Sequence, residues 1–253
     1  MSKSHHFEIL QNNTDITLDT AGKYCDRNIT VTANIDEEPI REAGIAFGVT
    51  QGREREYSTF WDAYQDNGNR TDYERAFWGK GWTAANYHPK YDLAPTNAAY
   101  MYQYSNIEGR VEVDTSQCTA MDAMFGMAKK ITTISTIDTR NISALAGVFG
   151  YMDKLENIDM LILKDDGSQT FTQSCFSGDF KLKEIRIQGK IGETLYMRCQ
   201  ALSKGSITSI FKALSDDVSG KTLHLSQWVK DDLTEAEWSA LTGAKQNWTI
   251  SFA

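Results

Sequence analysis

The clearest pattern along the chain is a recurrence of short apolar segments and phenylalanines within residues 106–205. Phe125, Phe149 and Phe176 follow one another at intervals of 24 and 27 residues, and each has a glycine one or two positions after it. Aliphatic segments recur alongside them and alternate with polar residues, as half-buried strands do. A period of this length is typical of stacked repeats. The inward strand positions, spaced 24 residues apart, are predicted to be Val113, Ile137, Leu161 and Ile185.

A single unit of this size cannot enclose its own apolar face, so neighbouring units must stack on one another. Stacking puts strand beside strand and makes the aliphatic positions one buried ladder, with the phenylalanines along the opposite side. The glycines allow tight turns or positive φ where each unit closes. Asp114-Thr115 and Asp138-Thr139 are expected to bind backbone groups just after two strands. We therefore expect a short, irregular leucine-rich-repeat solenoid, although the asparagine ladder of the standard pattern is missing.

The segments before the repeats predict two further units. Within residues 1–35, Ile16 and Leu18 and then Ile29 and Val31 alternate with polar residues, which indicates a two-stranded β unit that serves as an anchor. Such a unit is marginal alone and needs a surface to pack on. Residues 36–105 are expected to be an acidic linker followed by an aromatic-rich segment.

The aromatic-rich segment is predicted to form a helical cap on the open end of the stack. Tyr57, Phe60, Trp61 and Tyr64 have the spacing of one helical face. Thr71 is expected to cap a short turn that carries further aromatic residues. The alternative is an exposed ligand surface, because rigid amphipathic rings make efficient contacts. The candidate binding residues, for each of which a core position is the competing interpretation, are Trp61, Trp78, Trp82 and Tyr91.

Residues 206–253 are predicted to be an α/β cap for the other end. Ser206 is expected to cap an amphipathic helical pattern, and Lys221–Leu225 alternates like a strand. Thr234 and Glu237 have the spacing of a capping box, so a helix is expected there with Trp238 inward. A final strand follows from Trp248 onward. The expected fold class is therefore α+β and β-rich.

Charge and composition narrow the function classes. The 253 residues carry a formal net charge of −8, which disfavours binding to nucleic acid and to anionic membranes. No apolar run is long enough to predict membrane insertion, and the start of the chain lacks the pattern of a secretory leader. The four cysteines lie far apart and are interpreted as buried free thiols, with a disulfide left open.

No residue pattern predicts catalysis, a metal site or a cofactor. The four histidines form no metal-ligand motif, and no nucleophile elbow or phosphate-binding loop is present. Asp165-Asp-Gly167-Ser168 resembles part of a calcium loop but lacks the remaining ligands, so a simple turn is expected. We predict a non-enzymatic protein. A glycan hydrolase would need only one pair of carboxylates, and no pair stands out.

The repeats resemble the BspA-like leucine-rich repeats of bacterial surface proteins and of proteins encoded by Firmicutes phages. The resemblance rests on the Asp-Thr after the strand, the Phe-Gly step and the opening Leu155-Glu-Asn-Ile158. The segments 20–33, 57–97 and 233–250 are similar to flanking motifs of that phage group. The repeats are few and uneven for the family. The resemblance implies attachment or a structural role and brings no catalytic residues with it.

Two functions follow as hypotheses. The first is a virion protein such as a decoration, fibre or tail component, assembled in the host cytoplasm. It would contact other virion proteins and possess a repeat face for a host protein or glycan, and a homotrimer would suit a fibre. The second is a bacterial cell-surface adhesin that uses the same repeats. Neighbouring genes for capsid and tail proteins would favour the first.

Overall fold

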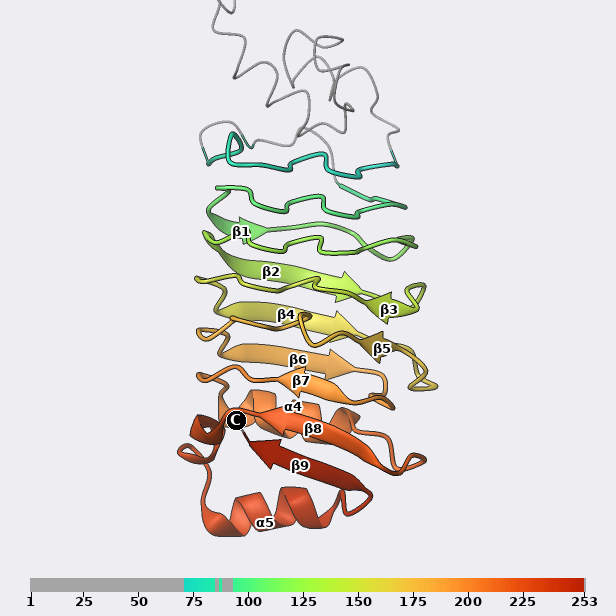
Figure 1. The fold of residues 1–253 in the computed structure, drawn as a ribbon, viewed down its shortest axis with the longest axis vertical. Coiled ribbons are helices and arrows are strands. Elements are labelled where there is room, and N and C mark those ends of the chain that lie inside the picture. The colour runs from blue at the N-terminus through green and yellow to red at the C-terminus, as the bar shows by residue number, and fades with distance from the viewer. Residues whose placement is uncertain (1–70, 85–86, 88–92, 253) are drawn as a thin grey trace, which may run out of the picture.

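The computed structural model describes residues 71–84, 87 and 93–252. The predicted β unit at 1–35, the helix at 57–64 and the binding candidates Trp61 and Tyr91 lie outside the described residues. Figure 1 shows the described chain as successive passes that lie one beneath another, ending in two helices and a small sheet.

The largest sheet consists of four parallel strands, each contributed by one pass of the chain. Ile134 pairs with Ile158, and Ile158 pairs with Ile185, so aliphatic side chains line up across the sheet. All three are buried. Parallel neighbours require a full crossover between strands, and here the rest of each pass provides it. In sheet order the strands are β1 (Gly109–Val111), β2 (Ile131–Asp138), β4 (Asn157–Ile162) and β6 (Glu184–Gln188).

The pairing of β4 with β6 corrects the expected strand spacing. The sequence predicted that Ile185 would follow Leu161 at the next equivalent position, but Leu161 pairs with Ile187 and Ile185 pairs with Ile158. The interval of 27 residues seen between Phe149 and Phe176 therefore applies to this pair of strands as well. The register shifts within the pair, which absorbs part of the difference.

Threonines fix the corner after the strands, as the sequence predicted. Thr115 Oγ1 donates to the carbonyl of Asp138 at 3.0 Å, and Thr139 Oγ1 donates to the carbonyl of Ile162 at 2.7 Å. Each hydroxyl thus joins one pass to the next. Beyond this corner β3 (Ala144–Leu145) pairs in parallel with β5 (Thr170–Phe171).

On the side opposite the large sheet, tandem turns connect the passes through a backbone ladder. Amides at alternate positions donate to the next pass: Phe125 N to Val148 O at 2.9 Å, and Phe149 N to Cys175 O at 3.0 Å. We call this side the turn face, and its segments are 73–79, 98–104, 121–127, 145–151 and 172–178.

The ladder begins well before residue 106, so the described residues of the expected aromatic-rich cap belong to it. Phe77 N donates to Met101 O at 2.8 Å, and Tyr102 N donates to Met124 O at 2.7 Å. A parallel β-bridge also joins Asp72 to Asn97. The described residues of 71–105 contain no helix, because their amides bond to the next pass rather than within one turn of helix. The structure shows no break at the boundary that we placed at residue 106.

One column of stacked rings runs through the interior behind the turn face. Tyr102 lies 5.2 Å from Phe125, with the two ring planes only 3° apart. Phe125 lies 6.0 Å from Phe149, and Phe149 lies 5.1 Å from Phe176. Phe77 extends the column at 5.2 Å from Tyr102. All five rings are buried, so this column and the aliphatic strand positions form one core.

At the C-terminal end, helices replace strands on the sheet side while strands continue on the other side. Strands β7, β8 and β9 form a parallel three-stranded sheet. The strands predicted at Lys221–Leu225 and from Trp248 are confirmed, as is the capping box between Thr234 and Glu237. The elements are β7 (Leu195–Met197), α4 (Lys204–Ala213), β8 (Lys221–Leu225), η3 (Gln227–Lys230), α5 (Glu235–Gly243) and β9 (Trp248–Phe252).

Helix α4 closes the open edge of the large sheet through serine side chains. Ser206 Oγ accepts from Ile185 N at 2.8 Å and donates to Lys183 O at 2.8 Å. Ser209 Oγ accepts from Ile187 N at 2.8 Å. These amides belong to the edge strand β6, whose unpaired groups would otherwise invite another strand. Ser206 was predicted to cap the helix, but Ser203 does so, because Ser206 is turned towards β6.

The described chain is therefore an α+β protein with mostly parallel strands and few helices.

Candidate binding surface

The predicted core residues and the predicted binding residues occupy different places. The strand and phenylalanine positions named from the sequence are buried. Trp82 is also buried, at 2% exposure, and its ring meets Phe77 edge-on at 5.0 Å, so its proposed role in binding is corrected to a role in the core. Trp78 is half-buried and lies on the turn face.

The turn face has an unusual backbone. In the same column of the ladder lie Gly79, Tyr104, Met127, Tyr151 and Gly178, and all five have positive φ. The values for the three non-glycine residues are 62°, 59° and 62°. Positive φ suits glycine but is sterically unfavourable for residues with a Cβ. Large side chains in this column are therefore held in a conformation that glycine adopts at lower cost.

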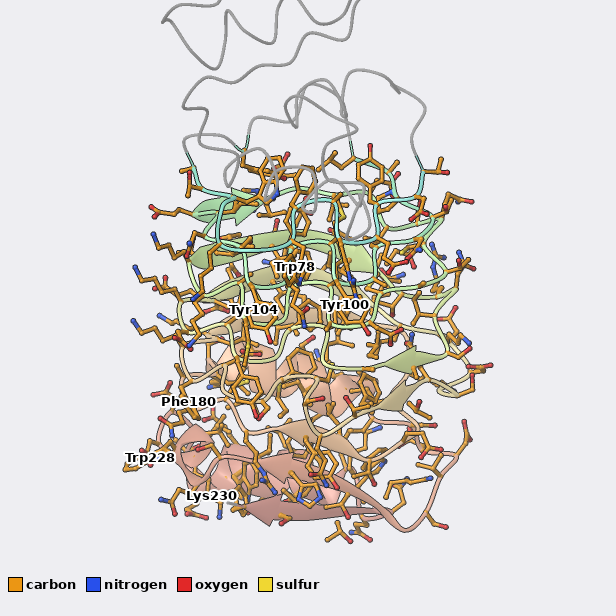
Figure 2. All side chains as sticks on the ribbon, turned by 45° about the horizontal axis from the view of Figure 1, so that its top comes forward. Trp78, Tyr100, Tyr104, Phe180, Trp228 and Lys230 are labelled. Carbon is orange, nitrogen blue, oxygen red and sulfur yellow. The ribbon has the colours of Figure 1, made fainter. Side chains whose placement is uncertain are left out.

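These side chains form a ridge on the outer surface. Tyr104 is 40% exposed and Tyr151 is 47% exposed. Trp78 packs edge-on against Tyr104 at 6.2 Å, and its indole Nε1 donates to Gln103 Oε1 at 3.2 Å. We call Trp78, Tyr104, Met127 and Tyr151 the aromatic ridge. Figure 2 shows Trp78, Tyr100 and Tyr104 together on this side of the molecule.

Further exposed rings occur towards the C-terminal end. Phe180 is 56% exposed and Trp228 is 54% exposed, and both lie at the margin of the view in Figure 2. On the strands that continue this side, Tyr196 stacks on His224 at 4.3 Å with an interplanar angle of 7°. His224 alternates with the buried residues Leu223 and Leu225, so its ring lies on the opposite face of the strand from theirs. Burial lowers the pKa of His224, with a further contribution from Arg198.

The outer face of the large sheet is polar by contrast. Thr136 is exposed on β2, and Arg110 forms ion pairs with Asp159 at 2.6 Å and with Glu112 at 2.8 Å. Exposed ion pairs of this kind contribute little to stability. No large exposed hydrophobic residue lies on β1, β2, β4 or β6. Exposed rings are therefore confined to the rest of the described surface.

Buried titratable groups among the described residues include Asp179 and three cysteines. Asp179 is buried, and burial raises its pKa to about 8. The hydrogen bond that its carboxylate accepts from Met152 N at 2.9 Å opposes this shift, because it lowers the pKa. Cys175 and Cys199 are free and buried, and burial raises both thiol pKa values, which makes the thiolate nucleophile scarce. Cys118 is also free and buried, as the sequence predicted.

The segment that resembles a calcium loop is a simple turn. Asp166 Oδ1 accepts from Ser168 N at 2.9 Å, and Gly167 has a φ of 69°. This backbone hydrogen bond is the main cause of the lowered pKa of Asp166. Among the described residues no group of three or more His, Cys, Asp or Glu side chains is placed to hold a metal ion.

Sequence reasoning missed Tyr104 and Tyr151. The signal was available, because each residue follows two positions after a ring of the buried column, Tyr102 and Phe149 respectively. What the sequence did not reveal was the positive φ that turns this position outward.

No protein-family model, curated protein or solved structure matches the chain. None of the helices in the described part of the chain is long and apolar enough to cross a membrane.

Proposed function

We propose that the chain is a non-catalytic attachment or structural protein built on a short, irregular leucine-rich-repeat solenoid of the BspA-like type. The observation that carries this proposal is the in-register parallel pairing of β2, β4 and β6 together with the continuous column of buried rings. Each pass supplies one strand and one ring, so each pass buries its apolar side only against its neighbours.

The role follows from what this architecture leaves exposed. A stack of passes presents a long, preformed surface, and binding to such a surface costs little conformational entropy. The leading proposal is a virion component, such as a decoration, fibre or tail protein, that contacts other virion proteins and a host protein or glycan. This location is supported by the resemblance of the repeats and flanking segments to those of Firmicutes phages.

Mass spectrometry of purified particles tests the location. Particles would be induced from the organism that encodes the chain, banded by density and compared with a washed cell-wall fraction of the same culture. We expect the chain to band with capsid and tail proteins. Finding it in the cell-wall fraction and not in particles would contradict the virion role and favour the second candidate, a bacterial surface adhesin with the same repeats.

A further inference from the structure

Two residues of the aromatic ridge, Tyr104 and Tyr151, adopt an unfavourable backbone conformation while their side chains stay exposed. A residue with a Cβ is less stable in the left-handed region than in the right-handed one. Tyr104 and Tyr151 both adopt this region and remain 40% and 47% exposed. Gly79 and Gly178 occupy the same column in other passes, so glycine is compatible with this turn. Backbone strain of this kind often accompanies ligand contact.

The rings are also held in place before any ligand arrives. Trp78 packs against Tyr104 and is itself fixed by its hydrogen bond to Gln103. Tyr151 lies against the bare backbone of Gly178, where an added Cβ would meet Tyr151 Cδ1 at 2.8 Å. Gly178 therefore provides room for this ring. Preorganised side chains lose little freedom on binding.

The spacing of the ridge suits a linear polymer of rings. Tyr104 and Tyr151 are separated by one intervening pass, which carries Met127. Neighbouring strands in a sheet lie about 4.8 Å apart, so the two tyrosines are roughly 10 Å apart along the stack. A chain of sugar rings laid along the stack would meet both tyrosines and pass over Met127.

The chemistry of the ridge favours a glycan over a protein. Each pyranose has one apolar C–H face and a polar rim, and a single exposed aromatic ring matches that apolar face. A stable protein interface needs a contiguous, fully desolvated apolar centre, which separated rings do not supply. The chain carries a net charge of −8, which repels polyanions. The matching ligand class is therefore a neutral polysaccharide.

We propose that the aromatic ridge binds a neutral polysaccharide by stacking sugar rings on Tyr104 and Tyr151. This inference rests on the proposed attachment role and specifies the ligand class.

Affinity electrophoresis of the full chain tests the inference. Native gels would contain hydroxyethyl cellulose, laminarin or galactomannan as neutral probes, and polygalacturonate as the anionic one. We expect retardation by at least one neutral polysaccharide and none by polygalacturonate. Retardation by none of the three neutral probes, or by polygalacturonate alone, would overturn the inference.

Paired substitutions connect binding to the rings. Tyr104→Asn and Tyr151→Asn remove the ring but keep a residue that tolerates positive φ, so the melting temperature should not fall. We expect each to weaken the affinity for the retarding polysaccharide at least tenfold. Tyr104→Phe and Tyr151→Phe should stay within threefold of the wild type. Thr136→Ala, on the polar sheet face, is the matched control and should bind like the wild type.

Unchanged affinity in both asparagine variants would also overturn the inference. The particle analysis described above is independent of this test. A chain that is present in particles but is not retarded refutes glycan binding alone, whereas a retarded chain that is absent from particles refutes the virion role alone.

Discussion

At the scale of single residues, the glycines that follow Phe125, Phe149 and Phe176 act through close packing as well as through positive φ. The sequence predicted that these glycines allow tight turns, and Gly178 has the positive φ expected of one. Gly150 does not. A Cβ built on Gly150 would lie 2.5 Å from the carbonyl oxygen of Ser174 in the next pass. Periodicity identifies such a glycine but does not distinguish the two causes.

Gly150→Ala is expected to destabilise the protein by about 1 to 3 kcal/mol, because the methyl group must push apart two hydrogen-bonded passes. Gly126→Ala is the matched control, since its Cβ would lie no closer than 3.3 Å to any neighbour. Urea unfolding of both variants measures the difference. Equal losses in the two variants would show that the contact with Ser174 is not the cause.

Asp179 makes stability depend on pH. Its pKa is raised from 3.8 to about 8 by burial, so the folded state retains a proton that the unfolded state releases. The free energy of unfolding should therefore fall as the pH rises from about 4 to about 8, by up to roughly 1.4 kcal/mol per pH unit from this group. Asp179→Asn should flatten this dependence.

Denaturant unfolding at pH 5 and pH 7.5 measures the effect of Asp179. The exposed neighbour Asp153, which pairs with Lys129 at 3.1 Å, provides the control Asp153→Asn. A wild-type slope that persists unchanged in Asp179→Asn would locate the pH dependence elsewhere in the protein.

At the scale of elements, the C-terminal end was the most predictable part and the 71–105 segment the least. A capping box and alternating strands are local signals, and they identified α5, β8 and β9. The aromatic-rich segment was expected to be a helical cap, yet its described residues bond across passes. These pairings join residues far apart in the sequence, and the local pattern does not specify which amide pairs with which carbonyl.

The serine contacts of α4 were not predicted either, and their contribution to the stability of the protein can be tested. Ser206→Ala leaves the buried amide of Ile185 without its acceptor, which should destabilise the protein by about 1 to 3 kcal/mol. It should also speed hydrogen exchange at the Ile185 amide. Thr208→Ala is the control, because Thr208 Oγ1 bonds only within its own helix, to Lys204 O. Equal exchange in both variants would contradict the role of Ser206.

At the scale of the whole molecule, the energetic coupling between two core residues should decrease with the number of passes that separate them. Phe125 contacts Phe149, and Phe149 contacts Phe176, but the first and third rings are separated by the second. In a stack with nearest-neighbour contacts, stability is close to a sum of local contributions and adjacent interfaces. The alignment of Phe125, Phe149 and Phe176 was predicted from their spacing, whereas the two further rings of the column, Phe77 and Tyr102, were not predicted to join it.

Double-mutant cycles test this decay. Phe125→Leu combined with Phe149→Leu should show an interaction energy of about 0.5 kcal/mol or more, whereas Phe125→Leu with Phe176→Leu should be additive to within roughly 0.5 kcal/mol. Unfolding in guanidinium gives each value. Equal coupling in both cycles would indicate a core that responds as one unit rather than pass by pass.

The way α4 closes β6 has a consequence for how such a molecule changes length. The serines contact only the final strand of the large sheet. The contacts that close this edge therefore do not depend on how many strands precede it. Duplicating the 24 residues from 131 to 154 should then lengthen the protein by one layer without redesign of either terminus. Gene duplication could thus change the length of the molecule by one layer at a time, while α4 still covers the sheet edge and prevents another strand from pairing there.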